Sequence, residues 1–178
     1  MELEVTGKFP PQVAGTLYRT GPSHYKVDTE NGEFALSHWF DGFTQIYRFK
    51  LVADDNGGCR VYYSSRRQTD ELVDQVRKTG SLDGIITFGQ QRDPCMSLFQ
   101  KVKSVFRPTG LGKSPGFSNV GATITANMPG MPKNRLTGLT DNTQIKLSDL
   151  ETLEPVGVTD QSSLHPSLKV RDFSAILA

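Results

Sequence analysis

Residues 34–51 read FALSHWFDGFTQIYRFKL, and this stretch decides the fold class. The run 34–40 is apolar and aromatic, and the run 43–51 alternates apolar with polar residues at the period of two that is typical of a half-buried strand. Asp41 and Gly42 stand between the two runs. Asp-Gly favours a tight type I′ turn, because both central residues of that turn need a positive φ. The stretch therefore predicts a β-hairpin.

The sequence on either side continues the β pattern. Residues 54–58 (DDNGG) predict a second turn, and residues 59–63 predict the next strand of a meander. Beyond a Gly/Pro/Ser-rich loop at 107–118, four more strands are predicted at 120–126, 135–140, 143–147 and 152–158. We expect an all-β fold with two short helices.

Two segments predict those helices. Residues 69–78 carry Asp70 and Glu71 in the first turn and two basic residues at the end, an arrangement that suits the helix dipole. Gly80 follows and is typical of a helix stop. Residues 93–106 open with Asp-Pro, a favourable N-terminus, and place apolar residues at helical spacing. We expect the second helix to pack on a larger body.

Composition excludes several classes of protein. The chain has 178 residues and a formal charge of +1, so its charge gives no reason to expect nucleic acid as a partner. No apolar run reaches the length of a membrane span, and the first residues lack the pattern of a secretory signal. Two cysteines are too few for a disulfide framework, so we expect a reducing, cytoplasmic location.

Candidate site residues are few, and each has two interpretations. His24, His38 and His165 could ligate a metal or carry a proton, or they could bond neighbouring groups in turns and strands. Arg19 could bind an anion or hold a loop through backbone carbonyls, and Arg66 and Arg67 have the same alternatives. Cys95 is expected to be a buried packing residue. Three histidines cannot form a site made of four, but the numbers allow a mixed site of histidines and carboxylates.

At these residues the chain resembles the carotenoid cleavage oxygenase family, the retinal pigment epithelium membrane protein type. The resemblance is carried by five motifs in the family's order. These are the segment GTLYRTGP at 15–22, HWFDG at 38–42, VYYSSR at 61–66, the FG…DPC…F pattern between 88 and 99, and NV at 119–120 with DLETLE at 149–154. The motifs are most similar to those of the fungal and animal carotenoid-cleaving branch, and stilbene-cleaving relatives are less similar.

The resemblance implies a seven-bladed β-propeller that holds Fe²⁺ on its axis through four histidines. It implies that O₂ is used to split a polyene C=C bond into two carbonyl products, with peripheral membrane contact to reach the carotenoid. Because a blade takes about 40–50 residues, 178 residues hold only part of the ring. We expect residues 1–169 to form a partial propeller of N-terminal blades, and residues 170–178 to be a divergent tail.

The family's first iron-ligating histidine follows a segment similar to LHPSLK at 164–169, and residues 170–178 contain no histidine. By the resemblance, His24, His38 and His165 lie outside the iron set. We therefore expect this chain to carry no iron ligand and no catalytic residue, and to be inactive alone.

Two alternatives stay open: a non-catalytic relative that binds a polyene or a partner protein, and a fragment of a stilbene-cleaving oxygenase. Leu111 and Phe117 form a candidate membrane contact, or an ordinary loop.

Overall fold

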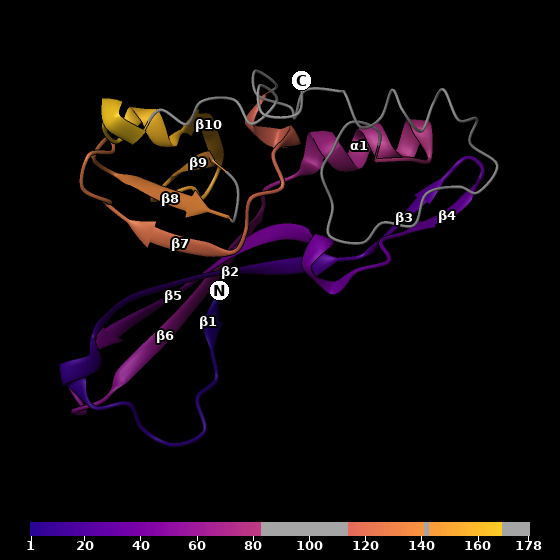
Figure 1. Cartoon of the computed structure of the whole chain (residues 1–178). Coiled ribbons are helices and arrows are strands. Elements are labelled where there is room, and N and C mark those ends of the chain that lie inside the picture. Colours follow the sequence, from indigo (N-terminus) through magenta and orange to yellow (C-terminus); the bar gives the residue numbers. More distant parts are fainter. Residues whose placement is uncertain (83–113, 141–142, 169–178) are drawn as a thin grey trace.

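The computed structural model describes residues 1–82, 114–140 and 143–168 (Figure 1). The strands are β1 (Glu2–Leu3), β2 (Gly15–His24), β3 (Lys26–Thr29), β4 (Gly32–Ala35), β5 (Phe43–Ala53), β6 (Cys59–Arg67), β7 (Thr123–Ala126), β8 (Arg135–Leu139), β9 (Gln144–Asp149) and β10 (Pro155–Asp160). The helices are α1 (Asp70–Thr79) and the short 3-10 turns η1 (Pro11–Val13), η2 (Trp39–Asp41), η3 (Pro115–Phe117), η4 (Gln161–Ser163) and η5 (Pro166–Leu168).

The strands form two four-stranded antiparallel sheets and one two-stranded hairpin. The first sheet has the order β1-β6-β5-β2, the second has the order β10-β9-β8-β7, and β3 pairs with β4. The mostly β class is confirmed, as are the strands predicted after residue 119. The second predicted helix, at 93–106, and the tail at 170–178 lie outside the described residues. Both sheets are open in the part that is described, and the seven-bladed ring stays a prediction.

The predicted turn at 54–58 joins β5 to β6 as a hairpin, in which Ala53 pairs with Cys59. The carboxylate of Asp54 accepts hydrogen bonds from the backbone N–H groups of Asn56 at 2.9 Å and Gly58 at 2.8 Å. An aspartate that bonds the backbone two residues on stabilises a turn, which is why this segment could be predicted locally.

The predicted hairpin at Asp41–Gly42 is wrong. β4 pairs with β3, whereas β5 pairs with β2 and β6, and a 3-10 turn separates β4 from β5. Gly42 has a φ of −49°, so a type I′ turn is absent. Glycine is needed here for space, because a Cβ would lie 2.5 Å from Pro22 Cβ and 2.9 Å from the ring of Tyr25. A close approach of chain segments, rather than a positive φ, accounts for the Asp-Gly pair.

The sequence did not predict β2 as a strand, because Gly21 and Pro22 interrupt it. β2 is the edge strand of the first sheet, so the missing N–H of Pro22 leaves no ladder partner unsatisfied on its outer side. The register with β5 shifts between Pro22 and His24, which places His24 at the end of a bulged strand.

The helix predicted at 69–78 is confirmed as α1. Gly80 closes it in the left-handed conformation, with a φ of 68°, and its N–H donates to the carbonyl of Val76 at 2.8 Å. The buried face of α1 packs on β3 and on the start of β5. This core contains Val27, Leu36, Phe43, Leu72, Val73 and Val76.

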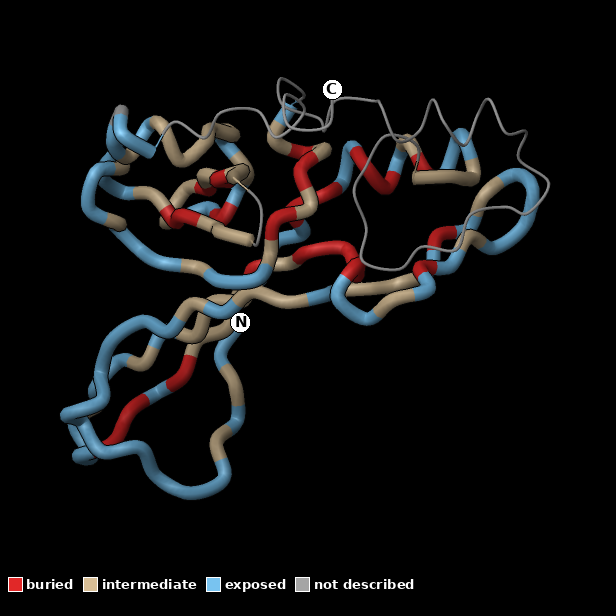
Figure 2. Tube along the Cα trace, in the orientation of Figure 1, coloured by how far each residue is buried: buried red, intermediate tan, exposed pale blue. Residues whose placement is uncertain are grey.

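A second core joins the two sheets. Ile46 of β5 packs against Leu136 of β8 and against Leu153, which follows β9. Figure 2 shows that buried segments gather where β5 passes the second sheet and along α1. Tyr18, Ile124 and Leu150 also pack against this cluster, and polar side chains are buried beside it.

Candidate functional site

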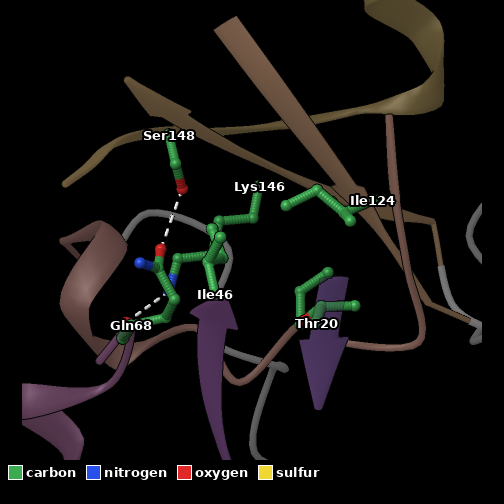
Figure 3. Close-up of a pocket in the computed structure, with 8 residues that line it drawn as sticks. Thr20, Ile46, Gln68, Ile124, Lys146 and Ser148 are labelled. Atoms are coloured by element: carbon green, nitrogen blue, oxygen red, sulfur yellow. Dashed lines mark hydrogen bonds between the residues drawn. The ribbon is translucent and has the colours of Figure 1, made fainter. Parts of the chain in front are cut away.

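A cluster of buried polar side chains lies between the two sheets. We call Gln68, Ser118, Lys146 and Ser148 the lysine cluster. Lys146 projects from β9 and is only 2% exposed. Its ammonium group donates to the backbone carbonyl of Gln68 (Figure 3) and, at 2.8 Å, to that of Ser118. The side chain therefore ties the second sheet to the segments that follow β6 and precede β7.

Gln68 is the centre of this cluster and is 1% exposed. Its backbone N–H donates to the carbonyl of Thr44 at 2.9 Å, and its side-chain Nε2 donates to the carbonyl of Leu153 at 2.7 Å. Its Oε1 accepts from the Ser148 hydroxyl at 2.8 Å (Figure 3). Each polar group of Gln68 thus has a partner, as buried polar groups require. Through its backbone and side chain together, this one residue links β5, β9 and the turn before β10.

Burial lowers the pKa of Lys146 to about 7, and the carboxylates of Asp70 and Glu71 at the start of α1 oppose this effect. Removal from water disfavours the ammonium form, because the interior does not replace the hydration of a charge. At neutral pH Lys146 therefore holds its proton much less firmly than an exposed lysine does. In either protonation state its nitrogen keeps enough N–H donors for both carbonyls.

The cavity beside Lys146 is small and mostly apolar. Its lining includes Thr20 and Ile46 from the first sheet and Ile124 from the second (Figure 3). About 10 Å³ is open to the centre of a water molecule, which is roughly enough for one water. A cavity of this size does not take a long polyene, and the bonds of the lysine cluster join the two sheets.

A different surface carries exposed aromatic rings. Trp39 and Phe40 of η2 are 69% and 72% exposed. The indole of Trp39 stacks on the ring of Tyr25 with centroids 5.0 Å apart. Large exposed apolar side chains that are held in place are typical of a contact with an apolar ligand or partner. We call Trp39 and Phe40 with the backbone of η2 the aromatic turn, and its two adjacent exposed rings make it a candidate contact for an apolar molecule.

The three histidines have separate local contacts. His24 stacks on Phe43 with centroids 4.8 Å apart, and its Nδ1 lies 2.6 Å from the Ser23 hydroxyl. Burial lowers the pKa of His24, and the charge of Arg67 acts in the same direction. His38 and His165 each accept a backbone N–H at 3.2 Å through Nδ1, at the start of η2 and near η5. Each ring nitrogen named here serves local structure.

Metal-ligating side chains do not gather in the described residues: no three of their His, Cys, Asp and Glu side chains are placed to hold a metal ion. Zinc, iron and copper sites in proteins need several convergent ligands. The residues that are described do not fit the iron centre implied by the resemblance. The expectation that the chain carries no iron ligand stays a prediction.

The other candidate residues have ordinary positions. Arg19 lies in β2 opposite Tyr47, and Arg66 forms a half-exposed ion pair with Glu154 at 3.5 Å. An arginine that holds a loop through carbonyls does exist, but it is Arg48, which donates to the carbonyls of Leu150 at 3.4 Å and Glu151 at 2.8 Å. Cys95 lies outside the described residues.

The candidate membrane contact is only partly described. Phe117 packs against the α1 core and is half-buried, which argues against its insertion into a lipid surface. Leu111 lies outside the described residues. Among the residues that the structure describes, no helix has the length and apolar character needed to cross a membrane.

Sequence reasoning missed Gln68, Asn119 and Lys146. The available signal was Lys146 itself, a lysine between Ile145 and Leu147 in a predicted strand. A charged residue on one face of such a strand is usually solvated, and only the packing of a second sheet on that face buries it. Asn119 was quoted as part of a motif without a role, which the structure supplies in its bonds to Thr44.

Comparison with known proteins places this geometry in context. Residues 1–175 match the family model described as retinal pigment epithelial membrane protein. Torulene dioxygenase of Gibberella fujikuroi is 39% identical over 94% of this chain, and carotenoid dioxygenase of Neurospora crassa is 35% identical over the same share. The chain spans about a third of these relatives, 31% and 32% of their lengths.

Solved structures agree with the sequence match. A Synechocystis apocarotenoid oxygenase variant, Glu150Asp, superposes with a TM-score of 0.60 at 25% identity. The superposition covers 89% of this chain and 28% of that one. The match thus includes both sheets and extends over nearly all of the sequence. The chain belongs to the retinal pigment epithelial membrane protein family of carotenoid oxygenases.

Proposed function

We propose that this chain is part of an oxygenase that cleaves a carotenoid polyene with O₂ to give aldehyde or ketone products. The observation that carries the proposal is the 39% identity to torulene dioxygenase over 94% of the chain. Because the chain spans only 31% of that relative, the activity belongs to a larger assembly of residues. The two four-stranded sheets have the size of propeller blades and support a partial seven-bladed propeller over residues 1–169.

The contribution of the chain to this activity is structural support and a polyene contact. The lysine cluster joins the sheets, and the aromatic turn presents Trp39 and Phe40 to the surroundings. A conjugated polyene is flat and apolar, so it gains burial and stacking on an exposed indole face. Trp39 is the side chain that we expect to contact the substrate.

The family implies Fe²⁺, held by histidines, as the group that activates O₂. In this chain His24, His38 and His165 bond to local groups and do not converge, so no step of the reaction is assigned to them. We propose that the chain alone neither retains iron nor cleaves carotenoid. The iron ligands of the active protein are then residues other than these three.

A graft tests the proposed function. Residues 1–169 of this chain replace the matching segment of the Gibberella fujikuroi torulene dioxygenase, and torulene bleaching is measured with Fe²⁺ and O₂. We expect the chimera to bleach torulene. We expect the isolated chain neither to bleach torulene nor to retain stoichiometric iron. A folded chimera that binds iron but leaves torulene intact would contradict the proposal, as would iron-dependent turnover by the isolated chain.

A second candidate is a non-catalytic relative that binds a partner protein. The open sheets favour it, since β10 and β2 are edge strands and exposed edges can pair with another chain. Size-exclusion chromatography distinguishes the two. A partial propeller isolated from the rest of an oxygenase should aggregate through its exposed edges, whereas a monodisperse monomer that melts cooperatively would favour a self-sufficient non-catalytic module. Preference for a hydroxylated stilbene over torulene in the graft would instead assign the chain to a stilbene-cleaving oxygenase.

A further inference from the structure

One side chain of the second half of the chain holds the aromatic turn. Asn119 Oδ1 accepts from the backbone N–H of Thr44 at 3.0 Å and from its hydroxyl at 2.7 Å. Asn119 Nδ2 donates to the carbonyls of Asp41 at 3.0 Å and Gly42 at 3.3 Å. All four bonds reach residues 41–44, more than 70 positions away along the chain.

The same turn is held from its other side by Pro22 of β2 and by Tyr25, which follows β2. A Cβ on Gly42 would lie 2.5 Å from Pro22, and Trp39 stacks on Tyr25. His38 Nδ1 caps the turn by accepting the N–H of Phe40 at 3.2 Å. The backbone from 38 to 44 is therefore fixed between β2 and the segment that contains Asn119. Asn119 anchors it to the segment that leads into the second sheet, and Gly121 of the same segment packs closely on Thr44.

An exposed ring on a fixed turn binds more tightly than one on a mobile turn. Ordering one side chain with several rotamers on binding costs up to roughly tenfold in affinity. Trp39 is 69% exposed yet lies on a backbone held by the four Asn119 bonds. Its orientation is thus set before any ligand arrives.

We propose that Asn119 is a positioning residue for polyene binding: it holds the turn that orients Trp39 toward the substrate. The inference rests on the proposed function, because it assumes that the apolar ligand of the aromatic turn is a polyene. Asn119 acts through the backbone at Asp41 and Gly42 and does not touch the ligand.

The single tryptophan of the chain reports on the turn directly. We measure the fluorescence anisotropy of Trp39 and its quenching by torulene in detergent micelles, using the full chain. Asn119→Ala should lower the anisotropy and raise the torulene concentration for half-quenching roughly tenfold. Ser118→Ala is the matched control, because it removes the neighbouring bond from Ser118 to Gln144 at 2.7 Å and leaves the turn intact.

Asn119→Asp covers the case in which Asn119→Ala does not fold. It keeps the shape and the acceptor for Thr44 but loses the donor to Asp41 and Gly42, so the same changes are expected. Anisotropy and half-quenching equal to those of the unmodified chain, in either folded variant, would overturn the inference. If torulene quenches no variant but the anisotropy still falls, the polyene proposal fails and the holding of Trp39 by Asn119 stands.

Discussion

Replacing Lys146 with Met tests whether the charge of a buried lysine sets the pH dependence of stability. Methionine is close to lysine in length and fills the same apolar path, but it does not titrate. The pKa of Lys146 is lowered to about 7 in the folded chain by burial, from an ordinary value of 10.5. Between these two pH values the unfolded chain binds more protons than the folded chain does.

The sign of the effect follows from proton linkage. Stability rises with pH wherever the unfolded state binds more protons, so the folded chain gains stability from about pH 7 to about pH 10.5. One pKa unit corresponds to about 1.4 kcal/mol, which sets an upper limit of about 5 kcal/mol over the whole interval. Between pH 7 and pH 9 the expected gain is about 2 kcal/mol.

The assay is urea unfolding followed by circular dichroism at pH 7, 8 and 9. The unmodified chain should gain about 2 kcal/mol more over this interval than Lys146→Met, because the other titrating groups are common to both. The absolute stability of the variant is not the readout, since the carbonyls of Gln68 and Ser118 lose their donor. Lys50→Met, at an exposed position of β5, controls for the loss of a positive charge. Parallel curves for the unmodified chain and Lys146→Met would refute the reasoning.

Two further substitutions test the packing of the aromatic turn at Gly42 and the hydrogen bonds of Gln68 in the lysine cluster. For each, the shift in the urea midpoint of unfolding is measured. Gly42→Ala should lower the free energy of unfolding by about 1–3 kcal/mol, because the added Cβ would overlap Pro22 and Tyr25. Gly21→Ala is the control and should be nearly neutral, because the space around its Cβ is open. Equal losses of stability in the two variants would count against close packing at Gly42. Gln68→Leu should lower the free energy of unfolding by about 2–4 kcal/mol, because the Leu153 carbonyl loses its donor and the buried Ser148 hydroxyl loses its acceptor. A loss below about 1 kcal/mol would show that water replaces these two hydrogen bonds.

Local chemistry explains which elements could be predicted. The dipole-matched charges and Gly80 define α1 within a few residues, and Asp54 defines its hairpin through bonds two and four residues away. β2 escaped prediction because edge strands tolerate glycine and proline, and nothing local distinguishes an edge strand from a loop. The Asp41–Gly42 pair was misinterpreted because a glycine is required there by close contact with Pro22 and Tyr25, which precede it in the chain by about 20 residues.

The candidate site could not be predicted because its bonds are long-range. Asn119 and Thr44 are 75 residues apart, and Gln68 and Leu153 are 85 residues apart. Each of these residues is an ordinary polar side chain in its own segment, and only the pairing of the sheets brings it to a buried partner. The family resemblance located Asn119 in a motif but gave no physical reason for the asparagine.

The buried polar groups at the junction determine how the two sheets meet. Apolar contact between them comes from Ile46, Leu136 and Leu153, with Tyr18, Ile124 and Leu150 packed around these three. Such contacts are non-directional and do not by themselves specify one register. Lys146 and Gln68 bond to fixed carbonyls, so a slip of either sheet would leave several buried groups unpaired at about 1–3 kcal/mol each. These bonds therefore fix the angle and register of the sheets even where they add little net stability. Because Asn119 lies next to Ser118, whose carbonyl Lys146 holds, the same joint that aligns the sheets also sets the turn that presents Trp39.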